Sequence, residues 1–184
     1  MNKLSKHLRA LIELVLFALF GAIMFVTAQV DIIPNVHPLA LFIVSFTAVY
    51  RFRAVIPVYV YVMLEGLYGG FNTWWIPYLY VWTVLWAMAM LIPRGIKTPV
   101  AAVLMAAVAG LHGIAFGLLY SPFQCYFMFK GDWDLTLAWL IQGLPFDGLH
   151  ALGNIVSILI AIPFIKLLSR LSEREYPYVD IKTK

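Results

Sequence analysis

A single carboxylate lies deep inside the apolar part of this sequence, close to a cluster of aromatic residues. Glu65 stands near the end of one apolar run, Gly69 and Gly70 follow it, and the next run opens with a segment rich in Trp and Tyr. A charged side chain at the centre of a lipid bilayer costs roughly 2.5–3.5 kcal/mol, so its presence there is by default a sign of function. Aromatic faces bind flat rings and cations. Together these residues predict a site for a flat, amine-bearing ring.

Further polar residues recur at helical spacing in the later apolar runs. Asp147, His150 and Asn154 are separated by three and four positions, so they share one face of a helix. His112 lies within the preceding apolar run. The candidate substrate-binding residues are Glu65, Asn72, Trp75, Tyr78, Trp82, His112, Trp133, His150 and Asn154. Aromatic walls with a few polar groups are the usual composition of a small-molecule site.

Several of these residues also have a purely structural interpretation. Trp75 can serve as an anchor at the membrane interface. The histidines and Asn154 can join helices through hydrogen bonds. Asp147 can cap the helix that follows it, and Glu65 can extend to the outer interface instead of facing a pocket. The sequence alone leaves both interpretations open for these residues.

The composition indicates a polytopic membrane protein. Of the 184 residues, 63% are hydrophobic and only 12% are charged, whereas soluble domains carry about 25% charged residues. No catalytic motif and no P-loop is present, so we expect neither enzymatic activity nor ATP hydrolysis by this chain. The lone Cys125 excludes an internal disulfide and gives no support for a metal cluster. We therefore expect a binding protein without cofactor, metal or nucleic-acid partner.

Prolines, glycines and charged turns divide the apolar sequence into six predicted helices within one all-α membrane domain, residues 1–184. The predicted helices cover about 14–30, 38–50, 54–68, 75–92, 100–120 and 148–171. Between the last two, residues 121–147 are expected to form a long connection that contains a short amphipathic helix at 135–143. The second and third helices are short for a crossing, so we expect them to extend into flanking loops or to lie inside the bundle.

The distribution of charge supports this topology. With the N-terminus in the cytoplasm, all thirteen Lys and Arg residues except Lys130 fall in segments on the inner side. Such a bias is what the positive-inside rule predicts. Both termini are therefore expected inside, and the loops at 31–37, 69–74 and 121–147 are expected outside. Glu65 and the outer halves of the later helices then face an external pocket.

Three further features point to a known family. Ala18 and Ala22 stand four positions apart in the first helix and leave a smooth stripe that another helix can approach closely. The segment 143–154, GLPFDGLHALGN, opens the last predicted helix. The third feature is the plan of six helices with both termini inside. In this combination the chain resembles the substrate-binding S component of energy-coupling factor (ECF) vitamin transporters, whose A-x-x-x-A motif the alanine pair matches.

The resemblance implies a division of labour in a prokaryotic cell membrane. An S component binds a vitamin or related micronutrient from outside, beneath a lid formed by the loop between its first two helices. It then docks through the alanine stripe, here Ala18 and Ala22, onto a coupling T subunit that carries two ATPase subunits. The thiamine-binding members are similar in using Glu, His, Trp and Asn around their ligand. A thiamine- or pyridoxine-like basic heterocycle is accordingly the expected cargo, with a flavin or another vitamin as the alternative.

Two other membrane-protein classes fit the same composition. A structural protein of the MreD type has a similar plan but no cargo, and its outer surface would lack a closed pocket. A tryptophan-rich, porphyrin-binding sensor of the TSPO type usually has five helices, whereas the charge pattern here favours six.

Overall fold

The computed structural model describes residues 6–30, 36–172 and 174–180, and these residues are mostly helical. In chain order the elements are α1 (Lys6–Ala28), α2 (Leu39–Tyr50), η1 (Arg51–Ala54), α3 (Val55–Gly69), α4 (Tyr78–Met90), α5 (Thr98–Ile114), α6 (Phe116–Phe123), the π-helical turn η2 (Gln124–Met128), α7 (Trp133–Ile158) and α8 (Ala161–Leu171). Within the described ranges no strand forms, apart from an isolated bridge between Lys97 and Val179. The predicted all-α class is confirmed.

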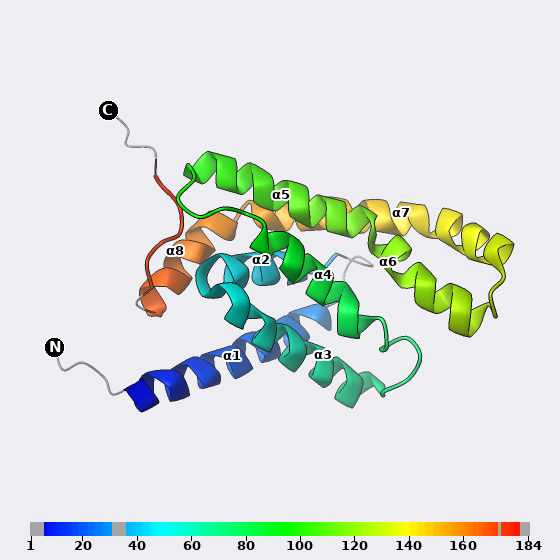
Figure 1. The fold of residues 1–184 in the computed structure, drawn as a ribbon, viewed down its shortest axis with the longest axis horizontal. Helices are drawn as coiled ribbons and strands as arrows, with labels where there is room; N and C mark the ends of the chain where they lie inside the picture. The colour runs from blue at the N-terminus through cyan, green and yellow to red at the C-terminus, as the bar shows by residue number, and fades with distance from the viewer. Residues whose placement is uncertain (1–5, 31–35, 173, 181–184) are drawn as a thin grey trace.

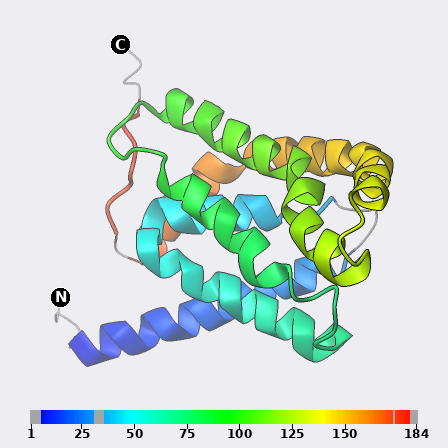
Figure 2. The same cartoon turned by 45° about the vertical axis from the view of Figure 1, so that its right-hand side comes forward.

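The helices are arranged in three layers (Figures 1 and 2). α1 packs along α3 on one side, α5 packs along α7 on the other, and α2 lies between them against α4 and α8. Every residue of α2 except Phe42 is buried. A helix that is apolar all round is one that packs against neighbours on every side. Of the two alternatives expected for the second and third helices, α2 therefore has the one in which a short helix lies inside the bundle.

Small residues allow the outer pairs of helices to approach closely. A Cβ at Gly21 of α1 would lie 2.4 Å from Cγ1 of Val60 on α3. In the opposite layer, a Cβ at Gly113 of α5 would lie 2.5 Å from the Cα of Ala151 on α7. Neither contact leaves room for a side chain, so these two glycines set the spacing within their layers.

The chain changes direction between α2 and α3 at Arg51, which has a positive φ of 53°. Its guanidinium donates to the carbonyls of Met90, at 2.6 Å, and Ile92, at 3.2 Å, just beyond α4. A cation that binds the free carbonyls at a helix C-terminus is stabilised both by hydrogen bonds and by the helix dipole. These bonds hold the strained turn against the end of α4.

Three predicted helices differ from the structure. The first, predicted at about 14–30, is α1 and already begins at Lys6, and the helix predicted at 100–120 is α5 followed by α6–η2, with a bend of 42° between them.

The last part of the chain differs most. Residues 121–147 are mostly helical, and the predicted helix at 148–171 is in fact the second half of α7 followed by α8, with a bend of 55° between them. α7 begins early because Asp132 caps it, accepting a hydrogen bond from the backbone N–H of Leu135 at 2.9 Å. Pro145 lies inside α7 without ending it. Pro163 falls in the first turn of α8, where proline is tolerated, so a separate helix starts there.

Two helical segments, 10–28 and 39–69, are long and apolar enough to cross a membrane. Two bent pairs, α5 with α6–η2 and α7 with α8, raise the number to four if each pair forms one span. The protein therefore has the helices of a membrane protein. Six separate spans and the orientation of the termini stay predictions.

Candidate functional site

A cavity of about 260 Å³ lies where α1, α2, α3, α4, α6 and α7 meet. We name it the central cavity. Its walls contain four of the nine predicted site residues, namely Glu65, Tyr78, Trp82 and His150. The remaining lining residues are Ala28, Gln29, His37, Leu39, Tyr61 and Phe116. The structure thus joins the predicted carboxylate to part of the predicted aromatic set.

Glu65 supplies the acidic group of the central cavity. Its side chain is buried, with 9% of the residue exposed, and Oε1 accepts a hydrogen bond from Nε2 of Gln29 at 3.0 Å. Gln29 directly follows α1, so the close α1–α3 packing brings this amide to the carboxylate. A carboxylate has about four acceptor positions. The Tyr61 hydroxyl is a second neutral donor to this carboxylate. Two neutral donors still leave capacity for a cationic donor from a bound molecule.

Aromatic rings enclose the space beside Glu65. Trp82 is the centre of the group, with ring centroids 5.9 Å from Tyr61, 5.7 Å from Tyr78 and 5.7 Å from Phe116. The two tyrosine rings stand nearly perpendicular to the indole, at 77° and 87°. Edge-to-face contacts of this kind are favourable and hold the rings in place. The cavity therefore has rigid aromatic walls.

A histidine pair lies against the same tryptophan. His112 is fully packed behind the wall, with its ring 5.8 Å from Trp82 and 6.3 Å from His150. Nε2 of His112 hydrogen-bonds the backbone carbonyl of Val81 at 3.1 Å. Nδ1 of each histidine and Nε1 of Trp82 are buried and have no hydrogen-bond partner in the described part of the chain. Buried unpaired groups are uncommon in native proteins. Of these three, Trp82 and His150 line the central cavity, so their free nitrogen atoms favour a polar molecule as occupant.

Two other predicted residues act within the scaffold. Trp75 donates from Nε1 to the carbonyl of Val62 at 2.7 Å and so attaches the start of the α4 region to α3. Asn154 donates to the carbonyl of Ala109 at 3.0 Å and links α7 to α5. Asn154 therefore joins two helices, as its structural interpretation expected, whereas Trp75 joins two segments of the protein and its expected role as a membrane-interface anchor stays a prediction. Neither residue lines the central cavity.

The last two predicted residues lie on the surface. Asn72 is in the exposed turn before α4, where its side-chain oxygen accepts from the N–H of Trp74 at 3.3 Å. Trp133 starts α7 at the far tip of the α6–α7 hairpin and is 74% exposed. Neither lines the central cavity. Both residues were selected because they lie in loops expected on the outer side of the membrane. That location alone did not predict contact with the cavity.

Sequence reasoning missed Gln29, Tyr61 and Phe116 as cavity residues. Tyr61 stands four positions before Glu65, so it occupies the same face of α3, and this spacing is a signal visible in the sequence. Phe116 stands four positions after His112, which is the same spacing. Gln29 meets the site only through helix packing and carries no comparable signal.

The predicted docking residues occupy the outer face of α1. Ala18 is exposed and Ala22 is partly exposed, while Gly21 between them faces α3. The predicted lid covers residues 31–37, of which 31–35 lie outside the described residues.

No protein family model, curated protein or solved structure was found to match this chain. The geometry of the central cavity and the sequence motifs are therefore the basis for assigning a function.

Proposed function

We propose that this protein is the substrate-binding component of an ECF-type transporter and binds a small, flat, positively charged heterocycle. The observation that carries the proposal is the central cavity, in which the buried Glu65 stands beside aromatic walls centred on Trp82. A binding subunit of this kind takes no part in ATP hydrolysis, in agreement with the lack of a P-loop in the sequence.

The charge of the cargo follows from the cost of burying Glu65. A buried carboxylate is tolerated when a cation or a strong donor pairs with it, because charge-assisted hydrogen bonds offset the loss of hydration. Within the described residues, no Lys or Arg forms an ion pair with Glu65. A cationic group on the cargo fills this role, and the tyrosine and indole rings favour a flat cationic ring.

The size of the cavity favours a compact compound. Its volume of about 260 Å³ lies just below the range of about 300–1,000 Å³ that is usual for drug-sized ligands. A one- or two-ring compound such as a thiamine- or pyridoxine-like molecule suits this space better than a three-ring flavin. The same argument disfavours a porphyrin, and a cavity lined by a buried carboxylate and aromatic rings favours a binding protein over a purely structural one.

The position of the charges supports the proposed topology. Arg53, before α3, and Arg174, after α8, both form ion pairs with Glu13 near the start of α1. Lys166 of α8 pairs with Asp180 of the C-terminal segment at 2.7 Å. Segments that the positive-inside rule places in the cytoplasm thus contact one another at one end of the bundle.

A panel of vitamins and their precursors, tested by thermal shift on the purified protein, examines the proposal directly. We expect one flat cationic compound to raise the melting temperature and to bind with micromolar or better affinity. Trp82→Leu, or Tyr78→Leu if the first variant does not fold, should weaken binding at least tenfold. Trp133→Leu is the matched control, because Trp133 is exposed, and it should bind normally. Absence of stabilisation by every compound would reject the proposal.

Co-purification with cell-wall machinery instead of a T subunit and ATPases would favour the MreD-type alternative.

A further inference from the structure

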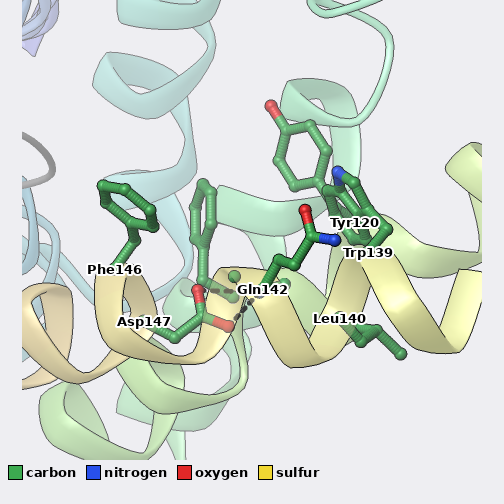
Figure 3. A pocket seen from close by; sticks show the side chains of 9 residues that line it. Tyr120, Trp139, Leu140, Gln142, Phe146 and Asp147 are labelled. Atoms are coloured by element: carbon green, nitrogen blue, oxygen red, sulfur yellow. Dashed lines mark hydrogen bonds between the residues drawn. The ribbon is translucent and has the colours of Figure 1, made fainter.

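A second pocket, of about 380 Å³, lies between α6 and α7 (Figure 3). We name it the α6–α7 pocket. Its main side chains are Phe116, Tyr120, Trp139, Gln142, Phe146 and Asp147. Figure 3 shows Gln142 and Asp147 rising from α7 on the same side, with Tyr120 and Trp139 beyond the Gln142 amide, whereas Leu140 points away. None of the substrate-binding or docking roles expected from the sequence involves this pocket.

Asp147 is the acidic group of the α6–α7 pocket. Only 7% of the residue is exposed, and both carboxylate oxygens lie 3.2 Å from the backbone N–H of Gly117. The sequence suggested that Asp147 caps the helix that follows it, but Asp147 lies inside α7 and instead caps the first turn of α6. This N–H is the sole donor to the carboxylate in the described part of the chain. A nearly buried carboxylate therefore retains free acceptor positions that face an aromatic pocket.

The α6–α7 pocket and the central cavity share one wall. Phe116 lines both, and its ring lies 5.7 Å from Trp82 on the cavity side and 5.1 Å from Tyr120 on the pocket side. Each space combines a buried carboxylate with several aromatic rings. The combination of a carboxylate and aromatic rings, which suits an organic cation, is thus present on both sides of Phe116.

We propose that the α6–α7 pocket is a second binding site for an aromatic cation, placed in series with the central cavity. Asp147 pairs with the positive charge, and the rings of Tyr120, Trp139 and Phe146 pack against the flat part of the molecule. That this cation is the same compound as the transported cargo rests on the proposed function. The site itself depends only on the pocket and its carboxylate.

Fluorine NMR of the full chain in lipid nanodiscs tests this proposal, with 5-fluorotryptophan at the six tryptophan positions. Trp139→Phe and Trp82→Phe assign the two reporter signals, one for each site. Benzylamine, which is cationic at neutral pH, is the probe, and benzyl alcohol is its uncharged match. We expect benzylamine to shift the Trp139 signal in a saturable manner, and benzyl alcohol to leave only the small, non-saturating change that partitioning into lipid produces.

Three variants locate the site. Asp147→Asn keeps an oxygen for the Gly117 N–H but removes the charge, and it should weaken the Trp139 response at least tenfold. Gly143→Leu places a side chain inside the pocket, because Gly143 lines it and no atom lies within 4 Å of the added Cβ; it should abolish the response. Gly148→Leu is the matched control, since its Cβ also meets nothing within 4 Å but Gly148 does not line the pocket.

Glu65→Gln separates this proposal from the proposed function. We expect it to suppress the Trp82 response to benzylamine and to leave the Trp139 response intact. A Trp139 response without any Trp82 response would support the second site and count against the proposed function. The second site is overturned if the Trp139 signal does not respond, responds equally to benzyl alcohol, or is unaffected by Asp147→Asn. Asp147 would then serve only as the cap of α6.

Discussion

Replacement of Glu65 by Gln distinguishes a ligand-binding carboxylate from a structural one, because the two roles predict changes of opposite sign in stability. Glu65 is 9% exposed, and the Gln29 amide donates to it at 3.0 Å. Glutamine has nearly the same shape and keeps an oxygen that can accept the same hydrogen bond. The substitution therefore removes the charge and little else.

The expected magnitudes follow from this geometry. Without cargo, the variant no longer buries a charge, a cost of roughly 2.5–3.5 kcal/mol at a bilayer centre, so its free energy of unfolding should be unchanged or higher. With cargo, the variant loses one charge-assisted hydrogen bond, worth roughly 1.5–3 kcal/mol. That loss corresponds to a dissociation constant about 10- to 150-fold higher.

Two measurements on the same preparation test the reasoning. Thermal melts without cargo report stability, and isothermal titration with the best compound of the vitamin panel reports affinity. Asp134→Asn, which neutralises an exposed carboxylate in the first turn of α7, is the control and should alter neither quantity. If Glu65→Gln lowers the melting temperature and leaves affinity unchanged, Glu65 stabilises the fold and our interpretation of the central cavity is wrong.

Three further predictions concern substitutions of small residues in the helices. Ala18→Trp, on the exposed face of α1, should abolish uptake of radiolabelled cargo in cells while the purified protein binds normally; loss of binding as well would place this residue in the fold instead of an interface. Gly21→Leu should destabilise the protein by about 1–3 kcal/mol, because its Cβ would stand 2.4 Å from Val60, and a melting temperature equal to the wild type would contradict the α1–α3 packing. Gly143→Leu and Gly148→Leu should each raise stability by up to about 1 kcal/mol, as both lie in α7 with open space around the new Cβ, and destabilisation by either would show a hidden contact.

The parts of the fold that depend on local sequence were predictable. The apolar runs indicated the helical class, and α2, α3 and α4 lie within a few residues of their predicted positions because glycines, prolines and charged turns end them. The last helices were not predictable in the same way. Gly143 and Pro145 suggested a break, whereas the cap at Asp132 and packing against α5 carry α7 straight through them.

The candidate site shows the same division between local and non-local information. Glu65 and Trp82 could be selected from the cost of burying charge and from aromatic content. Gln29 could not be selected in this way, because its contact with Glu65 depends on how closely α1 approaches α3. Gly21 of α1 sets the distance between these two helices. Asn154 satisfied the helical spacing rule but faces α5 instead of the cavity. Spacing shows which residues share a helix face, and only packing shows what that face contacts.

One spacing of three residues on α7 connects the two cavities. Asp147 lines the α6–α7 pocket, and His150, almost one helical turn later, lines the central cavity. Asp147 also holds the N–H of Gly117, which directly follows Phe116, the ring that separates the two spaces. The Asp147 carboxylate, which lines the α6–α7 pocket, therefore also positions Phe116 in the wall of the central cavity. Because a carboxylate has about four acceptor positions, Asp147 can keep the Gly117 N–H and still present free positions to a cation in the α6–α7 pocket.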